Sequence, residues 1–274
     1  MVNSRADYSE QATEAAHMVM LELVRILGEY RDDVVLVGGW VPELLFGDAN
    51  PRHVGSTDVD LALNHKTIDA ERYRTISEHL QKHGYVQGAQ PFIFFRSVNV
   101  GGQEVAVQVD LLSGEYGGAG KKHRHQPVQD IKARKARGCD LAFELAEEVK
   151  IEGKLPSGAK DSALVKVAGI VPFLVMKAMA LADRVKAKDA WDIYFCLRNY
   201  RGGNAALADA FQPHIKNKLV IEGLGKIREK FQSIEHFGPI SCADFDEISD
   251  PDDRALRIRD AFERVNDLLT RLDA

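Results

Sequence analysis

Cysteine and long apolar runs are both scarce in this chain of 274 residues. Its three cysteines, Cys139, Cys196 and Cys242, are widely spaced and odd in number, which argues against a disulfide framework or a zinc site and favours a reducing, cytoplasmic setting. The longest apolar stretch, 169–176, is far shorter than the roughly 20 residues that cross a bilayer. The opening residues also lack the apolar core of a secretory leader, so we expect no membrane partner.

The chain also lacks an excess of positive charge, since its formal net charge is −5. A protein of this charge that binds nucleic acid must do so through a local basic patch. Residues 121–137 are a candidate, with seven lysines or arginines, two histidines and a single aspartate. A solvated loop and helix face would have the same composition, so this segment does not decide between the two.

Helical and strand-like patterns alternate in the first part of the chain. We predict helices over 9–29, 40–46 and 67–83, strands over 34–37, 58–63, 92–98 and 104–112, and a hairpin over 148–167. The rest is helical, with helices predicted over 172–199, 204–218, 219–232 and 251–272. The predicted fold class is α/β (α+β), with a mixed, mostly antiparallel sheet flanked by helices over residues 1–168 and a helical domain over 169–274.

Two aspartates on the predicted strand 58–63 are the first chemical signal. Asp58 and Asp60 are two residues apart, so a strand directs both carboxylates to the same face. Such close like charges repel unless a cation lies between them, and Mg²⁺, or Mn²⁺ in its place, takes oxygen ligands of this kind. Asp110, on the polar face of a later strand, joins them if the two strands are neighbours. A D-x-D pair by itself is also common on charged edge strands and in turns.

Gly38 and Gly39 follow the first predicted strand and open a short helix. Glycine allows the backbone to approach phosphate oxygens, and the first N–H groups of a helix bind anions. Ser56 adds a hydroxyl group two residues before Asp58, where it could also contact a triphosphate. Trp40 could stack on a base, although a tryptophan more often packs in the core.

A second set of charges lies in the helical part of the chain. At about 100° per residue, Lys177, Arg184, Lys188 and Asp192 share one face if the helix is unbroken, whereas Asp189 lies off that face. An amphipathic helix with a charged outer face would give the same pattern. The flanking sequence is apolar on both sides, however, and cations beside a buried helix suit a triphosphate or a departing pyrophosphate.

The order of these features resembles the polymerase-β-type nucleotidyltransferase superfamily. The resemblance rests on VLVGGW at 35–40, STDVDLAL at 56–63 and VDLL at 109–112. It implies a triphosphate-binding set and a metal-binding set: Gly38 and Gly39 with a nearby hydroxyl for the first, and Asp58, Asp60 and Asp110 for the second.

The helical segment narrows the resemblance. The pattern K-x-x-A-L-x-x-R-x-x-x-K-D-x-x-D, from Lys177 to Asp192, is similar to a block of the AbiE-type (AbiEii) abortive-infection toxins, which are nucleotidyltransferases paired with a cognate antitoxin. The similarity implies that Lys177 contacts the nucleotide and that Asp189 is needed for activity. Arg184, Lys188 and Asp192 would be supporting positions of the nucleotide-binding set.

Three functions are compatible with the sequence. The leading one is a Mg²⁺-dependent enzyme that transfers NMP from an NTP to an RNA hydroxyl, such as the 3′ end of tRNA, as the toxin of a toxin–antitoxin pair. Gly-Gly-Trp is also similar to the aminoglycoside nucleotidyltransferases, which would make a small molecule the acceptor. The third is a non-catalytic member of the fold that binds a nucleotide or a partner, and the retained set of repelling carboxylates argues against it.

Overall fold

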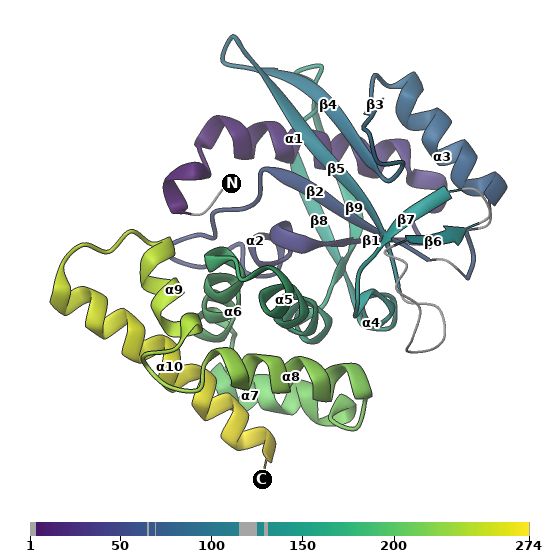
Figure 1. Cartoon of the computed structure of the whole chain (residues 1–274). Helices are drawn as coiled ribbons and strands as arrows, with labels where there is room; N and C mark the ends of the chain where they lie inside the picture. The colour runs from purple at the N-terminus through teal and green to yellow at the C-terminus, as the bar shows by residue number, and fades with distance from the viewer. Residues whose placement is uncertain (1–3, 65, 69, 115–124, 129–130, 274) are drawn as a thin grey trace. The chain divides into compact units, whose positions relative to one another are not determined.

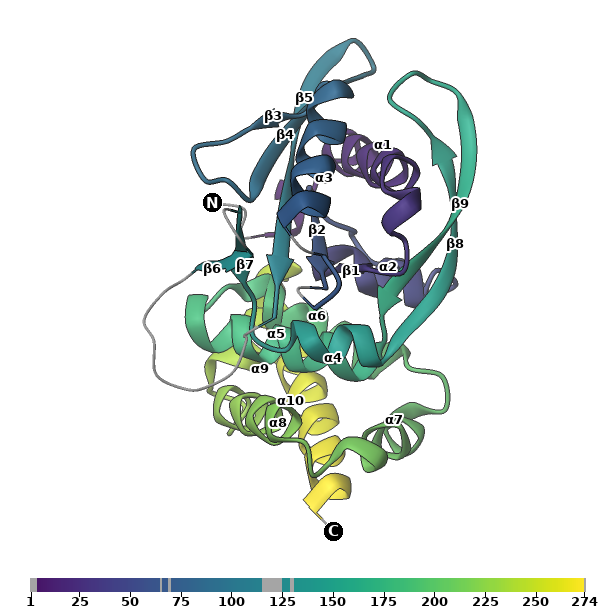
Figure 2. The ribbon, with the colours of Figure 1, turned by 90° about the vertical axis from the view of Figure 1, so that its right-hand side faces the viewer.

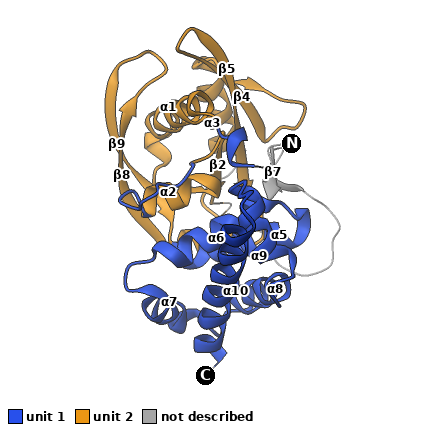
Figure 3. Cartoon of the chain, turned by 90° about the vertical axis from the view of Figure 1, so that its left-hand side faces the viewer, with its two compact units in different colours: residues 1–8, 46–54, 170–274 blue, residues 9–45, 55–169 orange. Residues whose placement is uncertain are grey.

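The computed structural model describes residues 4–64, 66–68, 70–114, 125–128 and 131–273. The chain forms two compact units, coloured separately in Figure 3. The β unit comprises Ser9–Leu45 and Gly55–Gly169, and the helical unit comprises Met1–Tyr8, Phe46–Val54 and Ile170–Ala274. The division into domains 1–168 and 169–274 stays a prediction. The side chains of the basic segment 121–137 lie almost entirely outside the described part of the chain.

The β unit is built on a mixed sheet (Figure 1). Its described strands are β1 (Val34–Val37), β2 (Asp58–Leu63), β3 (Val86–Gln87), β4 (Ile93–Val100), β5 (Gln103–Ser113), β6 (His125–Val128), β7 (Ile131–Lys135), β8 (Ala146–Lys154) and β9 (Lys160–Ala168). Their order is β3-β4-β5-β2-β1-β9-β8, with β7 paired to β5 and β6 paired to β7. The pairs β1–β9, β2–β5 and β5–β7 are parallel and the other described pairs are antiparallel, so the predicted fold class is confirmed.

One face of the sheet is covered by a long amphipathic helix. The helices of this unit are α1 (Glu10–Ile26), α2 (Val41–Leu45), α3 (Ala70–Lys82) and α4 (Cys139–Glu144). The Ser9 side chain caps α1 by accepting a hydrogen bond from the Ala12 N–H. The helix packs against β4, β5, β8 and β9, and Figure 2 shows it between the two long hairpins. Leu61 of β2 lines a small cavity with Leu23 and Val24 of α1, so the alternate residues of β2 face away from this helix.

The helical unit is a bundle in which two helices make most of the packing. Its helices are α5 (Ile170–Arg184), α6 (Ala187–Asn199), α7 (Gly203–Phe211), α8 (Lys218–Lys230), α9 (Phe237–Phe245) and α10 (Pro251–Asp273). The helix α5 packs on α6 and α8, and α10 packs on α6, α7, α8 and α9. The Asp250 carboxylate caps α10 by accepting hydrogen bonds of 3.0 Å from the backbone N–H groups of Asp252 and Asp253.

The prediction of a single helix over 172–199 is wrong. The chain breaks at Val185, which has a φ of 49°, and Lys186, whose extended backbone starts α6. A β-branched residue is strained in the left-handed region, so contacts elsewhere must hold this break in place. The argument that placed Asp189 off a shared helix face therefore does not apply.

Across the ranges that the structure describes, no helix has both the length and the apolar character needed to span a bilayer.

Candidate functional site

The strands β2 and β5 bring the three predicted carboxylates to neighbouring positions. The two strands are parallel and in a register that pairs Asp60 with Asp110 and Asp58 with Gln108. Paired residues of neighbouring strands project to the same face, and so do residues two apart on one strand. Asp58 and Asp60 are partly buried, whereas Asp110 is 4% exposed. Asp110 was expected to join Asp58 and Asp60 if their strands were neighbours, and β2 and β5 are neighbours.

The predicted glycine turn lies directly against this acidic face. Gly38 has a φ of +76°, and Val37 before it pairs with Asp60 across the antiparallel β1–β2 ladder. A Cβ atom on Gly38 would lie 1.9 Å from Asp60 Oδ2 and 2.9 Å from Asp60 Cβ, so the Asp60 side chain would have to move. Gly39 is buried in the same 3₁₀ turn, Gly38–Trp40, which leads into α2. Glycine is thus required at position 38 by backbone conformation and by the Asp60 carboxylate.

Asp58 and Asp110 accept hydrogen bonds from neutral side chains. The Ser56 hydroxyl, which is 5% exposed, donates to Asp58 Oδ1. Gln108 Nε2 donates to both carboxylate oxygens of Asp110 at 3.1 Å. The structure thus places the Ser56 hydroxyl against Asp58. Gln108 was not among the predicted site residues, although strand alternation already placed it on the polar face of β5.

Trp40 is a core residue that fixes the backbone beside the acids. Its side chain is 4% exposed, and its indole Nε1–H donates a 2.9 Å hydrogen bond to the carbonyl oxygen of Asp58. The ring packs edge-on against His17, with centroids 5.6 Å apart. Gly55 has a φ of +70°, and a Cβ atom there would meet the Trp40 ring at 3.0 Å. The tryptophan is therefore placed to hold Asp58 in position.

The three carboxylates offer the hard oxygen ligands that divalent cations take. Within the described part of the chain, however, no group of three or more aspartate, glutamate, histidine or cysteine side chains is arranged so that it could hold a metal ion. Mg²⁺ does not need such a group, because it keeps several waters and is held by one or two carboxylates together with substrate phosphates. Cys139, near the acids, is a buried thiol whose pKa is raised by burial and by the charges of Asp140 and Asp60. A thiol that stays protonated is a poor ligand, which leaves the carboxylate oxygens.

The predicted charges of the helical unit form one buried ion-pair network across the break between α5 and α6. Lys177 Nζ lies 2.9 Å from Asp189 Oδ1 and 2.6 Å from Asp192 Oδ2. Arg184 binds Asp189 with two hydrogen bonds, of 2.6 and 2.7 Å. Lys188 Nζ lies 2.9 and 3.1 Å from the two Asp192 oxygens. Asp189 is central to this network, and its bond to Arg184 spans the left-handed residue between the helices.

Burial and charge act against each other in this network. The side chains of Lys177, Asp189 and Asp192 are at most 8% exposed, whereas that of Arg184 is 48% exposed. Burial opposes the charge of Lys177, yet Asp189 and Asp192 outweigh it and raise the pKa of the ammonium group. Burial likewise opposes ionisation of Asp192, but the charges of Lys177 and Lys188 hold its pKa well below the ordinary value. Lys188 differs, because burial lowers its pKa more than Asp192 raises it.

His53 completes the network and was not predicted as part of it. Its Nε2 lies 2.8 Å from Asp192 Oδ1, and neither side chain is exposed to solvent. Burial, followed by the charge of Lys188, lowers the pKa of His53 to about 4. The imidazole is therefore neutral at pH 7, and a neutral ring bonded to a carboxylate must donate from Nε2. The ring packs against Trp191 and Phe195, with centroids 5.0 and 4.8 Å away.

The comparison with protein families decides what kind of protein carries these residues. The model of the family described as nucleotidyl transferase AbiEii toxin, type IV toxin–antitoxin system, matches residues 22–271, which include all the predicted site residues. The chain belongs to the AbiEii nucleotidyl transferase toxin family. Membership in the AbiEii family makes it a nucleotidyltransferase, implies an NTP substrate and places it in a toxin–antitoxin context. Neither a curated protein nor a solved structure gave a match.

Proposed function

We propose that this AbiEii-family protein transfers NMP from an NTP to a hydroxyl group of an RNA, such as the 3′ end of tRNA, in a Mg²⁺-dependent reaction, and acts as a toxin by doing so. One observation carries the proposal: Asp60 and Asp110 are register partners on parallel strands, with Asp58 on the same face. A polar strand edge does not require three carboxylates on one face. Nucleotidyl transfer uses such a face, because the cations that accompany the triphosphate require hard oxygen ligands.

The proposed roles concern the acidic strands β2 and β5 and the glycine turn beside them. Asp58, Asp60 and Asp110 hold Mg²⁺, for which Mn²⁺ can substitute, while Ser56 and Gln108 orient two of these carboxylates. The amide groups of the turn that contains Gly38 and Gly39 receive the triphosphate. When bound, the cation neutralises triphosphate charge and lowers the pKa of the attacking hydroxyl. The acceptor hydroxyl group releases its proton to solvent, its oxygen bonds to the α-phosphorus, and the bond to pyrophosphate breaks, so that pyrophosphate leaves.

The buried network of the helical unit contributes through Arg184. Its guanidinium group is half exposed and is held by Asp189, which Lys177 holds in turn. We therefore propose that Arg184 contacts nucleotide phosphate and that Lys177 and Asp189 are positioning residues for it. Asp192 neutralises Lys188 and is hydrogen-bonded to His53. These contacts complete the network that supports Lys177 and Asp189. This arrangement is consistent with a requirement for Asp189 in activity, although the residue is buried.

The RNA acceptor is supported by the basic composition of 121–137, which would contact backbone phosphates. A polycationic aminoglycoside would instead require an acidic acceptor site. The toxin–antitoxin context of the family also favours a cellular acceptor over a drug. A cognate antitoxin is accordingly the expected partner.

The acceptor can be identified by following the transferred nucleotide. The purified protein is incubated with Mg²⁺ and each of the four α-³²P-labelled NTPs, with total RNA, tRNA or an aminoglycoside as acceptor. We expect label in tRNA, none in EDTA and none with Asp58→Ala, whereas Glu104→Gln on the exposed part of β5 keeps full labelling. Label in the aminoglycoside alone, with raised minimum inhibitory concentrations in expressing cells, would assign a small-molecule acceptor instead. RNA labelling that survives Asp58→Ala would overturn the proposed roles of the acids.

A further inference from the structure

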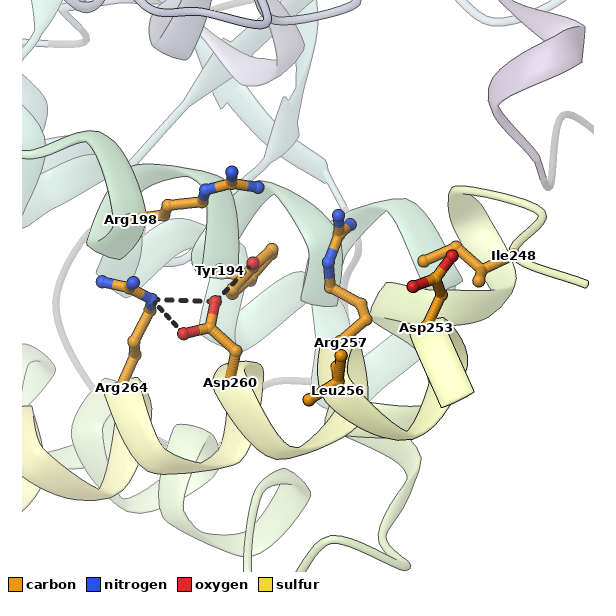
Figure 4. Close-up of a pocket in the computed structure, with 8 residues that line it drawn as sticks. All are labelled: Tyr194, Arg198, Ile248, Asp253, Leu256, Arg257, Asp260 and Arg264. Carbon is orange, nitrogen blue, oxygen red and sulfur yellow. Dashed lines mark hydrogen bonds and ion pairs between the residues drawn. The ribbon is translucent and has the colours of Figure 1, made fainter. Parts of the chain in front are cut away.

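A groove in the helical unit lies between α6 and α10 and is not part of the buried network. Its larger cavity, of about 420 Å³, is shown in Figure 4. A smaller cavity of about 230 Å³ adjoins it, because Tyr194, Arg198, Ile248 and Arg257 line both. We call the two together the arginine groove. The larger cavity falls within the roughly 300–1,000 Å³ of small-ligand sites.

Four guanidinium groups line the arginine groove, and its carboxylates do not neutralise all of them. Asp246 is shared by Arg5, at 3.1 Å, and Arg257. Asp260 accepts hydrogen bonds from Arg264 at 2.9 and 3.0 Å and from the Tyr194 hydroxyl at 2.6 Å. Burial opposes ionisation of Asp260, but Arg264, Tyr194 and Arg198 lower its pKa below the ordinary value. The lowered pKa keeps Asp260 charged, and both carboxylates already contact arginines of the groove.

Arg198 is the cation that remains. Among the residues that the structure describes, it makes no ion pair or hydrogen bond, and its side chain is exposed. Figure 4 shows its guanidinium group and that of Arg257 pointing to the same side of the groove. The groove has a third carboxylate, Asp253. Its four arginines and three aspartates together give it a net charge of +1. A guanidinium fork of this kind matches the oxygens of a phosphate group.

The rest of the lining is apolar and aromatic. Trp191, Tyr194 and Phe195 wall the smaller cavity, and Leu256, which is 66% exposed, lies at the rim of the larger one. An exposed leucine beside arginines suits a ligand that carries an anionic group on a flat or apolar body. We propose that the arginine groove binds a nucleotide, free or within an RNA strand, with its phosphate on Arg198 and its base against the apolar rim at Leu256. The proposal does not rest on nucleotidyl transfer by the β unit.

Calorimetric titration of the full chain in EDTA tests the proposal with three probes: inorganic phosphate, 5′-AMP and a short RNA. Arg198→Gln removes the unpaired charge. Its matched control is Arg201→Gln, because Arg201 is exposed, makes no ion pair within the described ranges and lines neither cavity. We expect 5′-AMP to bind the wild type about tenfold more tightly than Arg198→Gln, as loss of a charge-assisted hydrogen bond predicts, and Arg201→Gln to match the wild type. Both variants should unfold close to the wild-type temperature, since neither arginine makes a hydrogen bond or an ion pair within the described ranges.

The three probes separate the two sources of the nucleotide. Affinity for 5′-AMP equal to that for RNA indicates a free nucleotide, whereas tighter RNA binding that weakens steeply with salt indicates an RNA strand. In either case inorganic phosphate should bind most weakly, because it lacks the base. Binding of 5′-AMP and RNA that is equal in the wild type, Arg198→Gln and Arg201→Gln would overturn the proposal, as would failure of both to bind.

Discussion

The carboxylate of Asp60 fills the space that a side chain on Gly38 would need, since a Cβ atom there would lie 1.9 Å from Asp60 Oδ2. The glycine turn and the acidic strand are thus two parts of one local structure in this AbiEii-family protein. A change in the turn must displace the acid, and a change in the acid removes what the turn packs against.

Gly38→Ala is therefore expected to abolish transfer and to destabilise the β unit. The left-handed backbone alone costs roughly 1–2 kcal/mol for a non-glycine residue, and the displaced Asp60 adds to this. Gly102→Ala is the matched control, because Gly102 has a φ of +85° but open space around it. It should lose similar backbone stability in urea unfolding and keep its activity. Equal activity losses in the two variants would show that Asp60 is not the cause.

Trp40→Phe is expected to lower transfer activity without removing any proposed substrate contact. It deletes the hydrogen bond to the Asp58 carbonyl, and an unsatisfied buried acceptor costs about 1–3 kcal/mol. Trp191→Phe makes the same chemical change at an indole N–H that has no hydrogen bond among the described residues. Urea unfolding and initial rates of both variants separate the lost hydrogen bond from the lost ring volume. A Trp40→Phe protein with wild-type stability and rate would contradict the positioning role.

Asp189→Asn is expected to be strongly destabilising. Asp192 is then the one carboxylate left in the network to balance Lys177, Arg184 and Lys188. Breaking a buried ion pair costs about 3–5 kcal/mol. Asp183→Asn, on the exposed side of α5, should change stability by about 0.5 kcal/mol or less. Arg184→Gln tests the proposed phosphate contact separately. It should raise the KM for NTP and, because it also removes two hydrogen bonds to Asp189, destabilise the chain less than Asp189→Asn does. An unchanged KM would remove Arg184 from the substrate site.

The stability of the helical unit should fall as the pH falls through the range set by His53. Its pKa is about 4 in the folded chain and 6.5 in a model peptide, so the unfolded chain binds more protons between these values. The contribution of His53 is complete above pH 6.5 and is lost towards pH 4, by up to roughly 3 kcal/mol. His53→Gln keeps an N–H donor for Asp192 but does not titrate. Its unfolding free energy should vary less across this pH range, and an identical slope would place the titration elsewhere.

Alternation of polar and apolar residues was enough to predict the acidic half of the site. It predicted β2, β5 and the faces of Asp58, Asp60 and Asp110. The turn at Gly38 was predicted instead from the two glycines that follow a short apolar strand. The prediction that Asp110 joins Asp58 and Asp60 depended on β2 and β5 being neighbours. The sequence pattern could not establish this, because strand order depends on long-range packing. Gln108 and the buried role of Trp40 depend on that same packing.

The helical half was harder to predict because its decisive features have no local signal. The break at Val185 carries neither glycine nor proline, and it is held by the bond between Arg184 and Asp189 on either side of it. His53 lies in a loop, 139 positions before its partner Asp192 in the sequence. The helix α9 was not predicted, since Gly238 and Pro239 indicate a turn. Proline is tolerated there because the first turn of a helix does not use its N–H groups.

In the proposed reaction, Asp58, Asp60 and Asp110 together hold the cation for nucleotidyl transfer. The most direct measurement is the Mg²⁺-dependent rate of NMP transfer to tRNA by Asp60→Asn and Asp110→Asn, with Glu104→Gln as a control on the strand β5. We expect both aspartate variants to lose about a thousandfold in rate, as for loss of a major electrostatic contribution, and the control to keep the wild-type rate. Transfer at the wild-type rate by either aspartate variant would contradict this proposal.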